Sequence, residues 1–250
     1  MKLKITFLRF VLACGLLTSF SRVGAQSSDT EATGKVKLNF SGDLVSSYVW
    51  RGIKQTGASF QPSLALEAGG FTLGSWGSTD FRGGSEGGHK EIDFYASYAV
   101  GGFSATVTDV WFDGEGAYGY FSKPTGGNIG HLLEGSLAYT FSEKVPLTVA
   151  WNTFFLGEGD KNADGDNSYS TFIEFSYPFS FQGLDLDIAL GFTPWEGVLY
   201  GTTGFDVNEI KFGVSKGIKI TDTYSLPIFG AVIVNPAMED IHFVFGLRYE

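Results

Sequence analysis

The stretch of sequence that decides the fold is VKLNFSGDLVSSYVW, residues 36 to 50. Its even positions carry mainly apolar side chains, such as Leu38, Phe40 and Leu44, whereas its odd positions are mainly polar. Such period-two alternation is typical of a β-strand with one apolar and one polar face. The run is much longer than the usual strand of about 5 to 6 residues in soluble sheets. It therefore predicts one long amphipathic strand.

The same period returns along the rest of the chain. Further strands are predicted at residues 60–68, 71–80, 92–100, 103–112, 133–141, 147–155, 169–177, 184–192, 210–214, 226–234 and 241–249. With the first stretch these make twelve strands, an even number as in bacterial outer-membrane barrels. Two fit less well, since Asp109 interrupts the apolar phase of 103–112 and 71–80 has no clean phase. A bulge or a position above the lipid would explain either one.

The links between these strands fall into two alternating sets. Short links are predicted at 69–70, 101–102, 142–145, 180–183 and 221–225, and longer ones at 51–59, 81–90, 113–130, 157–167 and 194–207. This alternation favours an all-β fold, an up-and-down antiparallel transmembrane β-barrel with short periplasmic turns and longer outer loops. Aromatic residues near both strand ends predict two interfacial girdles, formed by Trp50, Trp111 and Trp195 at the loop end and by Phe71, Phe103, Phe141, Tyr177 and Tyr249 at the turn end.

A soluble β-sandwich is the alternative fold, because it also alternates in its strands and can be secreted. The long strands, the alternation of link length and the last run, Ile241 to Tyr249, all favour the barrel. That run places five apolar residues at period two and closes on an aromatic one, which resembles the C-terminal signature of outer-membrane barrels.

The first 25 residues have the pattern of a removable signal peptide. Lys2, Lys4 and Arg9 precede an apolar stretch over residues 10–20, and Val23-Gly24-Ala25 offers small residues for cleavage. A lipoprotein cut before Cys14 is the alternative. We therefore expect a short polar segment at 26–35, a barrel over 36–250, and a location in the outer membrane of a Gram-negative bacterium. The mature chain would hold no cysteine and hence no disulfide.

Composition narrows the function classes. Aromatic residues make up 16% of the chain and charged residues only 18%, which excludes a disordered chain. The net charge of -10 argues against binding to nucleic acid, which needs a basic face.

Two stretches resemble a known family. SSYVWRGIKQT at residues 46–56, followed by Pro62, and EIDFYASY at 91–98 resemble the TorF-type porin family, an uncharacterised group of outer-membrane proteins. The similarity covers the mature chain loosely, and its specific part is Tyr48-x-Trp50-Arg51-Gly52. The resemblance implies an outer-membrane barrel that passes solutes.

If the apolar phase faces lipid, the other phase lines a lumen that is mainly acidic. The inward set is Lys37, Asp43, Glu67, Glu91, Asp93, Glu134, Glu174, Asp185, Asp187, Lys211, His242 and Arg248. Twelve strands should enclose a narrow lumen, so we expect a pore that passes small solutes by passive diffusion with a weak cation preference. The alternative is a structural or ligand-binding barrel without conductance, plugged by acid-base pairs or a folded-in loop.

Arg51 is the first candidate for a contact at the mouth of the lumen, because it lies just beyond Trp50. Its alternative role is a hydrogen bond that ties down the first outer loop.

The sequence contains few patterns typical of catalytic sites, and we expect that the protein is not an enzyme. The chain has no G-x-S-x-G, H-E-x-x-H, Walker or dinucleotide motif. Carboxylates pair on one strand face at 91 and 93 and at 185 and 187, but a charged lumen wall does the same.

One loop matches the first half of a calcium loop, through Asp160, Asn162, Asp164 and Asp166. Position twelve is Thr171 instead of a bidentate Glu, and turn chemistry alone would favour such residues. We expect weak calcium binding at most and no other cofactor. The expected partners are outer-membrane lipid and lipopolysaccharide, the barrel-assembly machinery during insertion, and small solutes.

Overall fold

The computed structural model describes residues 36–81, 88–113, 120–121 and 130–249. The predictions of a signal peptide and of a polar segment at 26–35 lie outside these residues, as do most of the links at 81–90 and 113–130.

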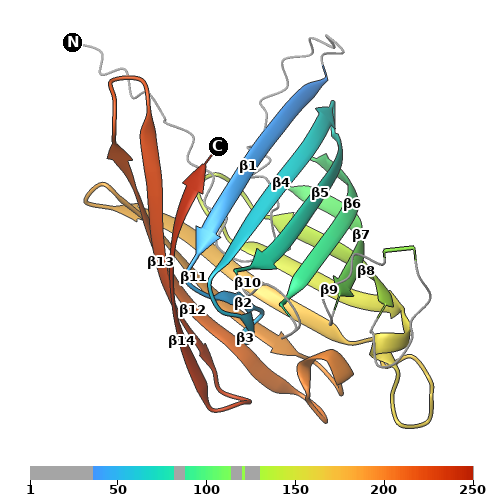
Figure 1. The fold of residues 1–250 in the computed structure, drawn as a ribbon. Coiled ribbons are helices and arrows are strands. Elements are labelled where there is room, and N and C mark those ends of the chain that lie inside the picture. The colour runs from blue at the N-terminus through green and yellow to red at the C-terminus, as the bar shows by residue number, and fades with distance from the viewer. Residues whose placement is uncertain (1–35, 82–87, 114–119, 122–129, 250) are drawn as a thin grey trace.

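The described chain forms a closed antiparallel β-barrel of twelve strands, as the alternation predicts (Figure 1). Going round the wall, each strand pairs with its neighbour in the chain, and the first strand closes the barrel against the last. The wall strands are β1 (Lys37–Val45), β4 (Ser59–Ala68), β5 (Phe71–Asp80), β6 (Lys90–Val100), β7 (Phe103–Asp113), β8 (Gly130–Thr140), β9 (Thr148–Leu156), β10 (Thr171–Phe181), β11 (Leu184–Thr193), β12 (Asp206–Lys219), β13 (Ser225–Asn235) and β14 (Asp240–Tyr249).

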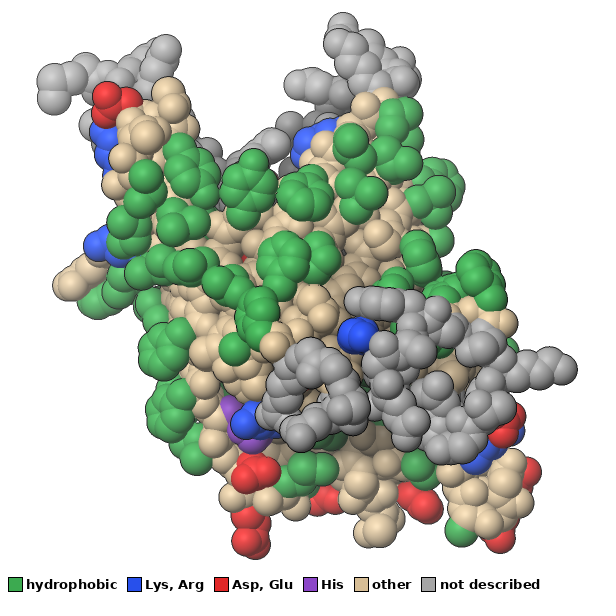
Figure 2. Space-filling view, viewed as in Figure 1, with side chains coloured by type: hydrophobic (Ala, Val, Ile, Leu, Met, Phe, Trp, Pro, Cys, Tyr) green, Lys and Arg blue, Asp and Glu red, His purple; other side chains and the backbone are tan. Residues whose placement is uncertain are grey.

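Side chains alternate between the two faces of this wall. On β14, Phe243, Phe245 and Leu247 are exposed on the outside, whereas Val244 and Arg248, at even positions of the same strand, are buried. Figure 2 shows apolar side chains spread over the outer surface of the strands. None of the helical turns in the described residues has the length and apolar character that crossing a membrane requires. The apolar exterior and buried polar interior of the barrel fit an outer-membrane barrel.

The two ends of the barrel differ as predicted. The tight turns at Gly69 and Gly101, both with positive φ, lie at the same end as the start of β1 and the end of β14 (Figure 1). The longer links lie at the opposite end, together with one short link at 236–239. Two 3-10 turns, η1 (Glu158–Asp160) and η2 (Val198–Tyr200), belong to these longer links.

The largest correction concerns the first predicted strand. It ends at Val45, and residues 48–56 form a separate hairpin of β2 (Tyr48–Trp50) and β3 (Ile53–Thr56). This hairpin lies inside the barrel (Figure 1), and the link predicted at 51–59 is therefore no outer loop. Period two continues to Trp50, but aromatic rings pack equally well into a protein interior as against lipid, so the pattern alone cannot fix their direction.

The predicted loop-end girdle is mostly wrong, because Trp50 packs inside the barrel and the ring of Trp111 is covered, with its centre 5.9 Å from that of Tyr120. Trp50 and Trp111 are 7% and 2% exposed, and only Trp195 of that set is exposed. At the turn end, the predicted aromatic band is largely confirmed. Phe71, Phe103, Phe141 and Tyr249 are exposed there, and Tyr177 is half-buried.

The two strands that fitted the pattern poorly are both part of the wall. The stretch without a clean phase is β5, with the predicted bounds of 71–80. Asp109 interrupts the apolar face of β7 because polar groups bind it there: Tyr120 donates a hydrogen bond of 2.5 Å to its carboxylate, and Nδ1 of His131 lies 2.8 Å from it. Neither position needs a bulge.

The closing seam is the shortest ladder in the wall. β1 and β14 pair over only four positions, Gly42–Val45 against Gly246–Tyr249. Every other pair of neighbouring wall strands shares between six and eleven positions. The barrel is therefore closed by far fewer main-chain hydrogen bonds than hold the rest of it.

Candidate functional site

The hairpin of residues 48–56, which we call the inner hairpin, is the candidate site. Its two-residue turn has positive φ at both positions, 48° at Arg51 and 81° at Gly52, as type I′ hairpin turns require. A Cβ on Gly52 would lie 1.9 Å from the carbonyl oxygen of Asn208, so only glycine fits against β12. Arg51 adopts the left-handed conformation that most residues avoid. Its side-chain contacts compensate for that cost.

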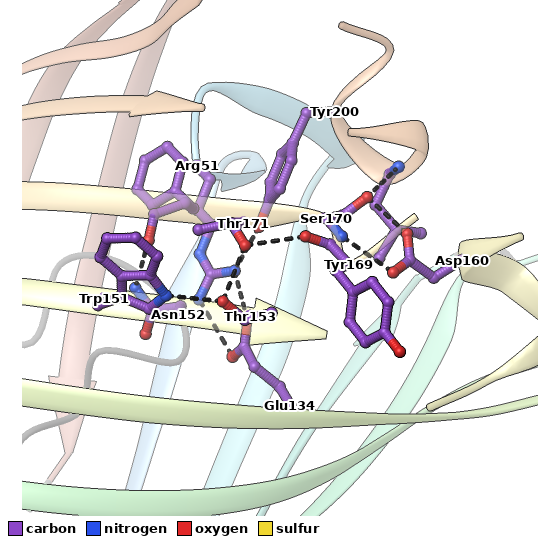
Figure 3. Close-up of polar contacts among 12 residues, drawn as sticks. Arg51, Glu134, Trp151, Asn152, Thr153, Asp160, Tyr169, Ser170, Thr171 and Tyr200 are labelled. Atoms are coloured by element: carbon purple, nitrogen blue, oxygen red, sulfur yellow. Dashed lines mark hydrogen bonds and ion pairs between the residues drawn. The ribbon is translucent and has the colours of Figure 1, made fainter. Parts of the chain in front are cut away.

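Arg51 connects the tip of the inner hairpin to the opposite wall (Figure 3). Its Nη1 and Nη2 donate to the two carboxylate oxygens of Glu134 on β8, at 2.6 and 3.1 Å. Nη1 also lies 2.6 Å from the hydroxyl oxygen of Tyr200 on η2. Arg51 and Glu134 are both almost fully buried. A bidentate pair of this kind is among the stronger side-chain interactions, because both partners are charged and geometrically matched.

Aromatic rings enclose the same guanidinium. Its central carbon lies 4.7 Å from the ring centre of Trp50 and 5.1 Å from that of Phe172 on β10. Trp50 in turn stacks on Tyr200, with ring centres 5.4 Å apart. These rings exclude water from the Arg51 ion pair. Because screening by water is what weakens surface ion pairs, the enclosure should strengthen this one.

Further hydrogen bonds fix the inner hairpin to other parts of the wall. The Tyr48 hydroxyl donates to Glu91 on β6 at 2.7 Å, and the Asn235 side chain on β13 donates to the Gly52 carbonyl at 3.2 Å. Thr56 donates to Asp80 at the end of β5, at 3.0 Å. The inner hairpin therefore touches the wall on several sides of the lumen.

The other face of the inner hairpin is apolar. Val49 packs with inward-facing side chains of the last two strands, in a buried cluster that also contains Val45, Phe229, Ala231, Ile233 and Val244. The two aromatic rings of the inner hairpin, those of Tyr48 and Trp50, belong to a second cluster that also contains Val110, Leu132, Phe154 and Phe172. The inner hairpin thus bridges two apolar areas within an otherwise polar interior.

Three predicted lumen residues meet at the inner hairpin, namely Arg51, Glu91 and Glu134. Asp93 is fully buried on the same face of β6 as Glu91. Arg51 itself lies inside the lumen and not at its mouth. Its hydrogen bonds hold the first link in place, which is the alternative role predicted for it.

The other predicted lumen residues are spread along the wall. Arg248 Nε donates to Asp43 at 2.7 Å, Lys211 pairs with Asp187 at 3.1 Å, and Lys37 approaches Glu67 at 3.9 Å. Asp185 accepts a hydrogen bond from Ser180, Glu174 is buried, and His242 is half-buried. Asp43, Asp187 and Glu67 are thus paired with basic groups, which reduces, without removing, the acidic excess that the sequence implied.

The residues of the predicted calcium loop satisfy one another. The Asp160 carboxylate accepts hydrogen bonds from the main-chain amide and the hydroxyl of Ser170, at 3.0 and 2.5 Å (Figure 3). Burial raises the pKa of Asp160, and these hydrogen bonds oppose that rise. The Asn162 side-chain oxygen accepts from the amides of Asp164 and Asp166. Among the described residues, no group of three or more His, Cys, Asp or Glu side chains could hold a metal ion.

Sequence reasoning missed the roles of Tyr48, Trp50 and Tyr200. The first two lie in the motif that carries the family resemblance, but their alternation suggested outward-facing positions. Ser46-Ser47 and the Arg51-Gly52 pair were the available signals, since small polar residues favour a bend and glycine permits a tight turn. Tyr200 had no signal, because its partner lies 149 residues away.

The fold and the site define a closed twelve-stranded β-barrel whose interior holds an inward-folded hairpin. No family model matches the chain, and no curated protein is significantly similar to it.

Proposed function

We propose that this chain is an outer-membrane β-barrel of the TorF-type porin family whose lumen is closed at rest by the inner hairpin. The observation that carries the proposal is the buried ion pair of Arg51 with Glu134, which joins the hairpin tip to a distant strand. The apolar exterior supports a membrane location, with lipid and lipopolysaccharide as neighbours. We expect insertion by the barrel-assembly machinery and no catalytic role.

Closure at rest follows from the packing of the inner hairpin. A solute would have to pass Tyr48, Trp50 and Arg51, all of which are buried among wall side chains. Removing them from that position breaks a charged hydrogen-bonded pair in a water-poor environment, which costs several kcal/mol. Thermal motion alone should therefore open the lumen rarely.

A constitutively open, weakly cation-preferring porin is the second candidate. The observation that favours it is the acidic excess of the inward strand faces, where Glu91, Asp93, Glu134 and Glu174 are all buried. In the first proposal the same acidic groups would set the selectivity of the lumen once the inner hairpin is out of the way.

Conductance in planar bilayers separates the two candidates. The tested proteins are the chain without its predicted signal peptide, residues 26–250, and a variant in which Asn-Gly replaces residues 46–58. Val45 and Ser59 pair directly, so a two-residue turn can join them and keep β1 paired with β4. Heat-modifiable migration in detergent gels verifies that both proteins are folded.

We expect the intact chain to be silent apart from rare steps. The shortened variant should give frequent steps, with a cation-favouring reversal potential in a salt gradient. Equal conductance of the two proteins would instead establish the open porin. Silence of both, with folding verified, would leave a structural or ligand-binding barrel.

A further inference from the structure

The inner hairpin is the bent tip of a longer hairpin. Val45 of β1 pairs with Ser59 of β4, and Tyr48 of β2 pairs with Thr56 of β3. Both pairs belong to one register, because three steps forward on one strand match three steps back on the other. Straightened, β1 with β2 and β3 with β4 would form one antiparallel ribbon with a single register shift, between Tyr48 and Val49.

The bend lies in four small residues, Ser46-Ser47 on one strand and Gly57-Ala58 on the other. Ser46 still belongs to the wall, since its amide donates to the Phe245 carbonyl at 2.8 Å and its hydroxyl accepts from the Phe245 amide at 2.9 Å. A Cβ on Gly57 would meet nothing within 4 Å, so the backbone there has room to rotate. The geometry is that of a hinge just beyond Ser46.

A second position for the inner hairpin, which we call the edge seat, lies along one edge of β14. We call its position inside the barrel the lumen seat. Within the described residues, the ladder of β14 with β1 stops at Gly246, although β14 continues to Asp240 and stays paired with β13 on its other side. The side of β14 that faces the hinge therefore carries main-chain groups with no partner strand, at Ile241 and Phe243. An unpaired strand edge is a template for another strand.

The side chains match the edge seat. Extending the β1–β14 register beyond Val45 sets Tyr48 opposite Phe243 and Trp50 opposite Ile241. Both β14 residues are exposed on the outer, apolar face, and aromatic with aliphatic or aromatic pairs stabilise antiparallel strands. In the same register Arg51 lies opposite Asp240, which offers its guanidinium a new carboxylate. The period-two pattern that continues to Trp50 suits this seat.

We propose that the inner hairpin swings about residues 46–47 and 57–58 between the lumen and the free edge of β14. In the lumen seat Arg51 binds Glu134; in the edge seat residues 46–51 extend β1 and complete the wall. The swing itself does not depend on the proposed function. Only the expected effect of the swing on conductance rests on that function.

Disulfide trapping in cell membranes tests the swing. The full chain, with Cys14 replaced by Ser, carries Trp50→Cys and Ile241→Cys, which are neighbours only in the edge seat. Tyr48→Cys with Phe243→Cys is a second pair in the same register, in case loss of Trp50 impairs folding. Leu44→Cys with Leu247→Cys, already opposite each other in the wall, is the positive control. Trp50→Cys with Phe245→Cys lies four residues out of register and is the negative control.

We expect both edge-seat pairs to cross-link, and the negative control not to. Glu134→Gln should raise the cross-linking rate about tenfold or more, because it weakens a charged hydrogen bond of the lumen seat and leaves Asp240 in place. Failure of both edge-seat pairs while the positive control cross-links would overturn the swing. Equal cross-linking of the out-of-register pair would also overturn it, since that result indicates a loose segment.

Bilayer recording of the cross-linked protein then separates the two proposals. Frequent conductance steps that disappear when the disulfide is reduced would support both the swing and the closed lumen. A cross-linked but silent barrel would support the swing and overturn the proposal that the inner hairpin is what closes a conducting lumen.

Discussion

Two links at the same end of the barrel, residues 46–58 and 157–170, have similar lengths but opposite structures. The first bends inward, and its charged residue Arg51 binds Glu134 and Tyr200, which lie 83 and 149 residues away. The second stays at the rim, and its charged residue Asp160 binds Ser170, only 10 residues away. The buried charge of the first link reaches distant elements, whereas that of the second link is bound within the link. The second link also accepts hydrogen bonds at Ser168, Tyr169 and Ser170 from the neighbouring link that carries η2.

The comparison teaches that the span of the anchoring contact distinguishes a structural loop from a candidate functional element. A rim loop whose buried charge is bound within the loop should change the lumen little when that charge is removed. A hairpin whose charge is compensated by a distant strand couples its position to the whole wall. Variants of Arg51 and Asp160 should therefore differ both in how far their effects extend through the structure and in how large the loss of stability is.

Arg51→Ala should have the largest effect. It leaves the buried carboxylate of Glu134 without its cation, and breaking a buried ion pair in this way costs about 3 to 5 kcal/mol of stability. Urea unfolding followed by tryptophan fluorescence measures the loss. Adding Glu134→Ala should restore part of it, because no unpaired charge then remains. Lys37→Ala is the control, since its ion pair is largely exposed and should matter little. An Arg51→Ala protein as stable as this control would contradict the anchoring role.

Gly52→Ala should be the next most disruptive. The left-handed conformation costs about 1 to 2 kcal/mol for a residue with a Cβ, and the contact with the Asn208 carbonyl adds steric strain. We expect a loss of about 2 to 4 kcal/mol in the same unfolding assay. Gly57→Ala is the matched control because its Cβ would meet no neighbour. If both glycine variants unfold alike, the fit of Gly52 against β12 is wrong.

Asp160→Ala should have a smaller and local effect. Two donors of Ser170 lose their acceptor, which corresponds to about 1 to 3 kcal/mol. Hydrogen exchange should accelerate within residues 157–170 and stay unchanged at the inner hairpin. Spread of the faster exchange to residues 48–56 would show that the rim link is coupled to the lumen after all.

Calcium should have the smallest effect on the rim link. Because Asp160 and Asn162 already accept hydrogen bonds within their own turns, we expect no heat in titration calorimetry at millimolar calcium. A saturable heat that disappears in Asp164→Ala would restore the calcium prediction, and would require residues 160–166 to rearrange.

Sequence patterns predicted the wall well because each strand carries its own evidence. Period two shows a strand and its faces without reference to other segments, so the last strand is predicted at 241–249, one residue short of β14 (Asp240–Tyr249). The local evidence for the inner hairpin is weaker, since only Ser46-Ser47 and Arg51-Gly52 indicate a bend and a turn. Tyr48 and Trp50 suit both an outward face and a packed interior, and what decides between these is contact with Glu91, Phe154 and Tyr200. Those contacts exist only after the barrel has closed.

The four-position seam between the first and last strands also bears on the order of assembly. During synthesis β1 emerges long before β14, so one of its edges has no partner until the chain is finished, and contacts of such high sequence separation form slowly. Meanwhile both strands present open edges that can pair with other chains. The partners of the inner hairpin, from Glu91 to Asn235, are made in the same interval. Closure of the seam and packing of the inner hairpin into the lumen should therefore be among the last steps of folding. Until then the open strand edges can pair with other chains, and a catalyst of insertion has to protect them.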